Sequence, residues 1–96
     1  MTEFLINEHW AEVDTVVVTG MVNTGSVRVG TVFTGVSRAP SPQIASESTA
    51  VVYFRVIRIV AYGHAIYDLP DGMSGELFMK GEQTGHLKHG YLLVSK

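Results

Sequence analysis

Four histidines are the side chains best suited to hold a metal ion: His9, His64, His86 and His89. Two of them, His86 and His89, are three residues apart in a polar turn that is flanked by glycines. A zinc site needs three or four ligands in a tetrahedral array, so a third ligand, Glu82 or His64, would have to approach from another part of the fold. We therefore interpret these histidines as solvated turn residues and predict neither a metal site nor a cofactor.

Candidate catalytic groups are equally sparse. Nucleophilic catalysis needs a serine or threonine beside an oriented base, but the sequence has no Gly-x-Ser-x-Gly turn, and Ser74 fits a junction between turn and strand. Asp68, Asp71 and Glu76 fall near one connection, where turn chemistry explains the first two. We predict no catalytic residue. The alternative is a small enzyme or small-ligand binder that uses a barrel mouth near Asp68, Glu76 and His64.

Aromatic side chains mixed with arginine favour a binding surface. Such mixtures stack on nucleic-acid bases or anchor a protein partner. Three of these residues share one expected strand, and the others are expected near one end of the fold. The predicted partner-binding residues are Tyr53, Arg55, Arg58, Trp10, Tyr62 and His64. The competing interpretation is that Trp10 and the tyrosines close the ends of a barrel.

Length and composition narrow the class of protein. The 96 residues, 46% of them hydrophobic and 17% charged, predict one globular domain over 1–96. The net charge of -2 gives no overall attraction to nucleic acid, and the absence of cysteine excludes disulfides and thiol chemistry. The acidic N-terminus does not resemble a signal peptide, and no apolar run approaches the roughly 20 residues of a membrane span. We expect a cytoplasmic protein whose apolar surface is covered by a partner or by a second copy of the chain. In the second case the protein would be a structural homo-oligomer.

Valine, threonine and aromatic residues dominate the chain, and no segment shows a sustained helical period, so the sequence predicts an all-β fold. Tight turns are expected at 23–25, as a short hairpin, and at Gly30, as a bulge or corner where the alternation of apolar residues slips by one. One helical turn is expected at 65–69. The sequence predicts strands at 3–10, 13–22, 27–29, 32–33, 49–62, 76–80 and 91–95. The main connections are a Pro/Ser-rich loop at 37–48 and a polar turn at 81–90.

The glycine-spaced segment 18–30, Val-Thr-Gly-Met-Val-Asn-Thr-Gly-Ser-Val-Arg-Val-Gly, resembles the start of the second domain of elongation factor Tu and related translational GTPases. That family has Val-Thr-Gly-x-Val-x-x-Gly-x-hydrophobic-x-Val-Gly at this place. Further similar segments follow in the family's order at 59–62, 65–68, 71–72, 77–81 and 89–93. The resemblance covers about 13–96 and implies a small closed six-stranded, Greek-key-like β-barrel that stands alone.

The departures from this family bear on function. No Gly-x-x-x-x-Gly-Lys-Ser/Thr loop is present, so the resemblance does not bring nucleotide hydrolysis with it. The family's Gly-Arg-Gly segment, which helps to hold the aminoacylated end of tRNA, falls at 13–15, where this chain has Val-Asp-Thr, and the family's Asn falls at Ser74. The resemblance therefore implies a scaffold. We expect a non-catalytic binding module that engages a protein or an RNA-containing partner, with no membrane partner and no strong nucleic-acid signature.

Overall fold

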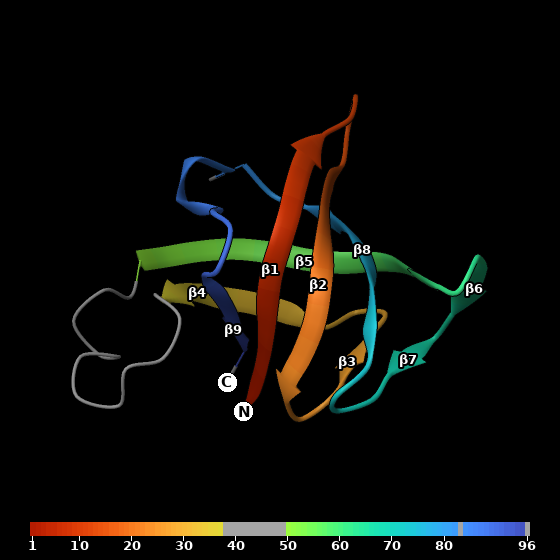
Figure 1. The fold of residues 1–96 in the computed structure, drawn as a ribbon. Coiled ribbons are helices and arrows are strands. Elements are labelled where there is room, and N and C mark those ends of the chain that lie inside the picture. Colours follow the sequence, from red (N-terminus) through yellow and green to blue (C-terminus); the bar gives the residue numbers. More distant parts are fainter. Residues whose placement is uncertain (38–49, 83, 96) are drawn as a thin grey trace.

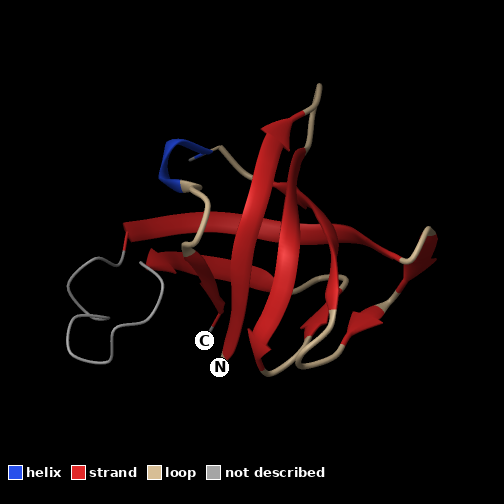
Figure 2. Ribbon diagram, in the orientation of Figure 1, coloured by secondary structure: helices blue, strands red, loops and turns tan. Residues whose placement is uncertain are grey.

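The computed structural model describes residues 1–37, 50–82 and 84–95, and strands dominate them (Figure 2). The strands are β1 (Thr2–Ala11), β2 (Val16–Thr24), β3 (Val27–Arg28), β4 (Val32–Ser37), β5 (Ala50–Ala61), β6 (His64–Ile66), β7 (Asp68–Leu69), β8 (Ser74–Lys80) and β9 (Leu92–Ser95). Helical structure in the described residues is limited to a single 3-10 turn, η2 (Thr84–His86). The described residues contain no helix that is long and apolar enough to cross a bilayer. Most of the expected Pro/Ser-rich loop, 38–48, lies outside the described residues, and Ser37 ends β4.

Six antiparallel strands close into a barrel. Their order is β4-β9-β1-β2-β8-β5, and a further pairing of β4 with β5 closes the ring. β6 extends the sheet beyond β5, and β3 pairs with β7 as a separate two-stranded ribbon. In Figure 1, β5 crosses behind β1 and β2. The structure thus confirms the closed six-stranded all-β barrel expected from the sequence.

The barrel is filled by apolar side chains, and in β1 and β8 these buried residues alternate with more exposed ones, as the two-residue period of a strand requires. Phe4, Phe33 and Phe54 come from three different strands and are completely buried in one core cluster, together with Ile59 and Leu77. Full burial of a phenylalanine stabilises the fold by about 1.5–3 kcal/mol relative to exposure. The three rings therefore hold β1, β4 and β5 together.

A bulge in β5 explains why the sequence pattern of this strand shows apolar residues on both faces. The register with β8 shifts between Val56 and Arg58. Before the shift Phe54 and Val56 point inward, and after it Ile59 does. One extra residue reverses the alternation, so both arginines, Arg55 and Arg58, are exposed although they have opposite parity in the sequence.

Two local predictions are wrong. The turn near Gly25, where φ is +78°, does not close a hairpin, because β3 pairs with β7 and not with β2. The expected helical turn at 65–69 is extended chain in β6 and β7, because β5 and β6 form a hairpin with Ala61 opposite His64. The expected corner at Gly30 is confirmed: φ there is +98°, and the chain turns between Arg28 and Val32 from the small ribbon into the barrel.

Candidate functional site

A row of outward-facing residues crosses four neighbouring strands of the barrel. Trp10 on β1 lies opposite Val17 on β2, Val17 lies opposite Phe78 on β8, and Phe78 lies opposite Arg58 on β5. Residues directly opposite each other on neighbouring strands have Cβ atoms about 5 Å apart. The four side chains therefore form a continuous band on the outside of the barrel.

Val17 is the apolar centre of this band. It stands between the core residues Val16 and Val18 on β2, so its own side chain points outward. Nevertheless it is completely buried, with 0% of its surface exposed, whereas Trp10 keeps 40% exposed. We attribute this burial to the larger side chains of Trp10 and Phe78 on either side. The row is a small apolar cluster on the surface.

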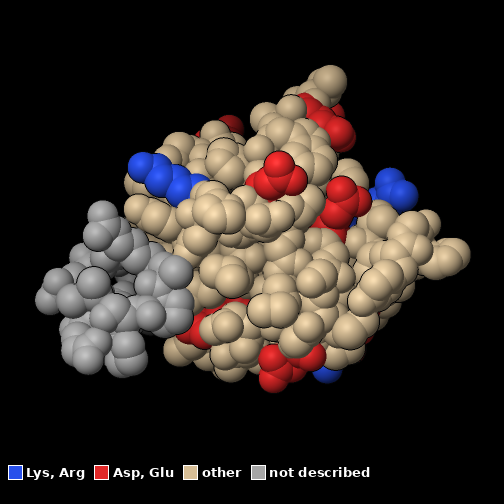
Figure 3. Space-filling model, viewed as in Figure 1, with Lys and Arg blue, Asp and Glu red and all other residues tan. Residues whose placement is uncertain are grey.

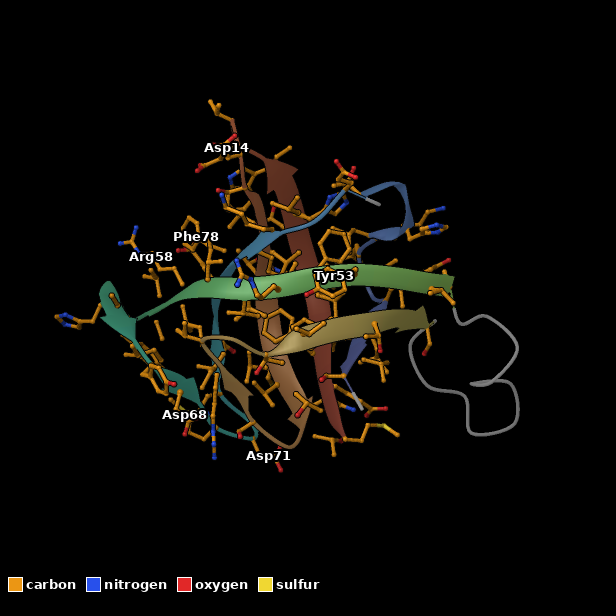
Figure 4. All side chains as sticks on the ribbon, turned by 180° about the vertical axis from the view of Figure 1, so that it is seen from behind. Asp14, Tyr53, Arg58, Asp68, Asp71 and Phe78 are labelled. Atoms are coloured by element: carbon orange, nitrogen blue, oxygen red, sulfur yellow. The ribbon has the colours of Figure 1, made fainter. Side chains whose placement is uncertain are left out.

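Arg58 covers the other end of the row. Its guanidinium carbon lies 5.3 Å from the centre of the Phe78 ring, within the range of a cation–π contact. Figure 4 shows the two side chains next to each other beside β5. This contact holds the arginine against an aromatic face and leaves its hydrogen-bond donors available to a partner.

Two further cations lie beside the row. Arg55 on β5 is directly opposite Lys80 on β8, and both are exposed. Neither forms an ion pair with any residue that the structure describes. Like charges placed opposite each other on neighbouring strands destabilise a sheet. The pair is therefore a local concentration of positive charge on a protein whose net charge is -2.

Tyr53 continues this surface along β5, with 56% of its surface exposed (Figure 4). We call the whole set the outer strip. The outer strip consists of Trp10, Val17, Phe78, Arg58, Arg55, Lys80 and Tyr53. It contains four of the six predicted partner-binding residues. Phe78 and Lys80 did not stand out in the sequence, because their importance comes from the pairing of β8 with β5.

The other two predicted residues, Tyr62 and His64, lie away from the strip at the hairpin between β5 and β6. Tyr62 has φ +54° and Gly63 has φ +77°, which are the positive values of a two-residue type I′ turn. Asparagine is the residue that commonly fills the first of these positions, so a tyrosine here carries backbone strain. Tyr62 is 78% exposed and borders a cleft.

This cleft has a volume of about 630 Å³ and is lined by parts of β1, β2, β8 and the end of β5. Its apolar lining includes Leu5, Met21 and Val60, and Glu76 supplies a carboxylate. None of the described residues that line it is lysine or arginine. The half-buried side chain of Glu76 makes no hydrogen bond or ion pair with any described residue. The cleft therefore combines an apolar floor with one unpaired negative charge.

The three residues of the expected barrel-mouth site are not brought together at this cleft. Glu76 lines it, but Asp68 and His64 do not. Asp68 lies 3.7 Å from Arg28 across the β3–β7 ribbon, at the opposite end of the barrel from Asp14 (Figure 4). The His89 ring contacts the backbone oxygen of Asn7 at 2.7 Å. The described residues contain no group of three His, Cys, Asp or Glu side chains that could hold a metal ion.

The charge distribution separates the cleft from the outer strip. On the face shown in Figure 3, most of the surface is uncharged, acidic side chains are scattered over it, and basic side chains appear at its margins. Asp14, which the sequence resemblance aligns with the arginine of the family's Gly-Arg-Gly segment, is exposed in the turn between β1 and β2. The positive charge of the outer strip is local and does not extend to this turn.

The strand order and its closure form a closed six-stranded antiparallel barrel, which is the fold implied by the resemblance to the second domain of elongation factor Tu. Among solved structures, the chain is similar to the crystal structure of translation elongation factor SelB from Methanococcus maripaludis in its apo form, with a TM-score of 0.73 and 20% sequence identity. The similarity covers 99% of this chain and 19% of the SelB chain. No family model matches the sequence, and no curated protein matches it significantly. At this identity the likeness shows the fold.

Proposed function

We propose that this chain is a non-catalytic binding module that uses the outer strip to engage a protein or RNA-containing partner. The single observation that carries the proposal is the row from Trp10 to Arg58, where a surface apolar cluster adjoins three cations that form no ion pair with any described residue. Tryptophan, tyrosine and arginine are the residues that most often dominate the energy of protein interfaces. The barrel supplies the rigid support that such a surface needs.

The likeness to a translation elongation factor suggests where the partner is to be sought. SelB is a translation factor, and the part of it that matches this protein is 19% of the SelB chain. The proposal therefore includes a role near the translation apparatus, in the cytoplasm. Fold alone does not transfer function. The support from SelB is therefore for the scaffold, and the support for binding comes from the strip.

The proposal predicts that a double variant, Trp10→Ala with Tyr53→Ala, loses the partner. A tagged chain is purified with its associated molecules from its native cells, and protein and RNA are both quantified. The matched control is Tyr67→Ala, which removes an aromatic side chain that is 68% exposed on the connection between β6 and β7. Circular dichroism checks that all variants are folded.

We expect one set of molecules to be at least tenfold depleted in the double variant and retained in the control. If the associated molecules are the same in all three proteins, the outer strip is not the binding surface and the proposal is wrong.

Small-ligand binding is a second candidate function, favoured by the Glu76 carboxylate in the cleft, which forms no ion pair with any described residue. The apolar floor and the single negative charge fit a small organic cation with an apolar body. Pockets for small ligands have volumes of about 300–1,000 Å³, and the cleft falls within this range. Tyr62 at the rim offers a ring for stacking.

Nuclear magnetic resonance titration with phenethylammonium tests this candidate. We expect a dissociation constant of about 1 mM, as for a fragment of this size, and about tenfold weaker binding by Glu76→Gln, because the charge-assisted contact is lost. The neutral analogue 2-phenylethanol should bind equally weakly to both proteins. Absence of shifts around Glu76, or equal binding of the cation by both proteins, would exclude the ligand class.

A further inference from the structure

We infer that the outer strip recognises an acidic segment of a partner protein, in which carboxylates alternate with apolar or aromatic side chains. This inference rests on the proposed function and names the chemistry of the partner. It starts from Arg55 and Lys80, which the register of β5 and β8 places directly opposite each other.

These two cations repel each other in the free protein. No described carboxylate lies within ion-pair distance of either, although acidic residues outnumber basic ones in the chain. A carboxylate placed between them would remove the repulsion and accept hydrogen bonds from both. Hydrogen bonds between ionised groups are about twice as strong as neutral ones. Among the described residues, this pair of cations is thus open to a carboxylate from a partner.

The apolar part of the strip supplies the second element of recognition. Val17 is completely buried, but Trp10 on β1 remains 40% exposed and Tyr53 on β5 remains 56% exposed. The strip therefore carries exposed aromatic surface as well as cations. Arg58 lies over Phe78 and offers a further charge-assisted contact. A segment that crosses β8 and β5 would meet cations and aromatic surface in turn.

Charge favours a protein segment over RNA. Release of counterions from a polyanion scales with the number of phosphates neutralised, and the strip offers three cations on a chain with net charge -2. Acidic side chains also border the positively charged part of the outer strip. Glu76 faces outward on β8 two residues before Phe78, and Glu12 accepts a hydrogen bond from the Trp10 ring nitrogen at 3.4 Å. A short segment with one or two carboxylates fits this surface better than a continuous phosphate backbone.

Selection of peptides from a displayed library of random sequences on the purified chain tests the inference. We expect the enriched peptides to combine Asp or Glu with an aromatic residue. Their synthetic forms should bind at least tenfold more weakly when the carboxylates are replaced by amides, and at least tenfold more weakly to the variant Arg55→Gln with Lys80→Gln. The matched control is Arg28→Gln, whose partner Asp68 lies on the β3–β7 ribbon, and it should bind as the wild type does.

Unfolding temperature separates lost binding from lost folding. Because the double variant removes a repulsive pair, its unfolding temperature should equal or exceed that of the wild type. Failure to enrich any peptide, enrichment without acidic residues, or equal binding by the double variant would overturn the inference. So would tighter binding of oligouridylate than of the acidic peptides at this strip. The proposed function would survive those results if Trp10→Ala with Tyr53→Ala still lost the native partner.

Discussion

Replacing Gly20 with alanine is expected to lower the free energy of unfolding by about 4 kcal/mol or more, a large part of the 5–15 kcal/mol typical of a domain. A Cβ atom at this position of β2 would overlap the backbone carbonyl of Leu5 on β1 and approach the Phe4 ring to 3.0 Å. Backbone on the facing strand cannot move aside without breaking the ladder between β1 and β2, in which Gly20 lies opposite Ile6. The glycine is needed for the close approach of these two strands.

Urea denaturation followed by circular dichroism measures this effect, and Gly85→Ala is the control. A Cβ at Gly85 would have no atom of a non-neighbouring described residue within 4 Å, and its φ is not in the positive range. The control should therefore change the free energy of unfolding by less than about 0.5 kcal/mol. A loss of less than about 1 kcal/mol for Gly20→Ala would show that β1 and β2 are not packed as described.

Replacing Phe54 with alanine is expected to cost about 3–5 kcal/mol, because it leaves a cavity in the middle of the core. Phe54 is completely buried and packs in the same cluster as Phe4 and Phe33. Its neighbour on β5, Tyr53, is 56% exposed on the outer face, so Tyr53→Ala should cost less than about 1 kcal/mol. Chemical denaturation of the two variants compares an inward and an outward ring on the same strand. Equal losses would contradict the register assigned to β5.

Much of the barrel could be predicted from the sequence, because strand periodicity and glycine spacing are local signals. The position of the long strand β5 and the corner at Gly30 both follow from residues close together in the chain. The predicted hairpin at 23–25 was wrong because the pairing of β3 with β7 is a long-range event. The sequence shows a turn but does not show which strand lies beside it.

The candidate site was less predictable for the same reason. Arg55 and Arg58 have opposite parity in the sequence, and a bulge in β5 brings both outward. Lys80 and Phe78 join the strip through strand register, which no local pattern of sequence encodes. Burial of Val17 on the outer face likewise depends on the residues opposite it on β1 and β8. Side-chain types indicated a binding surface, and topology decided its members.

In the function proposed above, the barrel is a scaffold for binding through the outer strip. Purification of the native partner with the wild-type chain, with Trp10→Ala plus Tyr53→Ala, and with Tyr67→Ala tests it most directly, and hydrogen exchange of the captured complex adds a map of the contact. We expect loss of the partner in the double variant alone, and new protection in β5 and β8 of the wild-type complex. If the double variant retains the partner, or if the new protection is confined to the β3–β7 ribbon, the outer strip is not the binding surface.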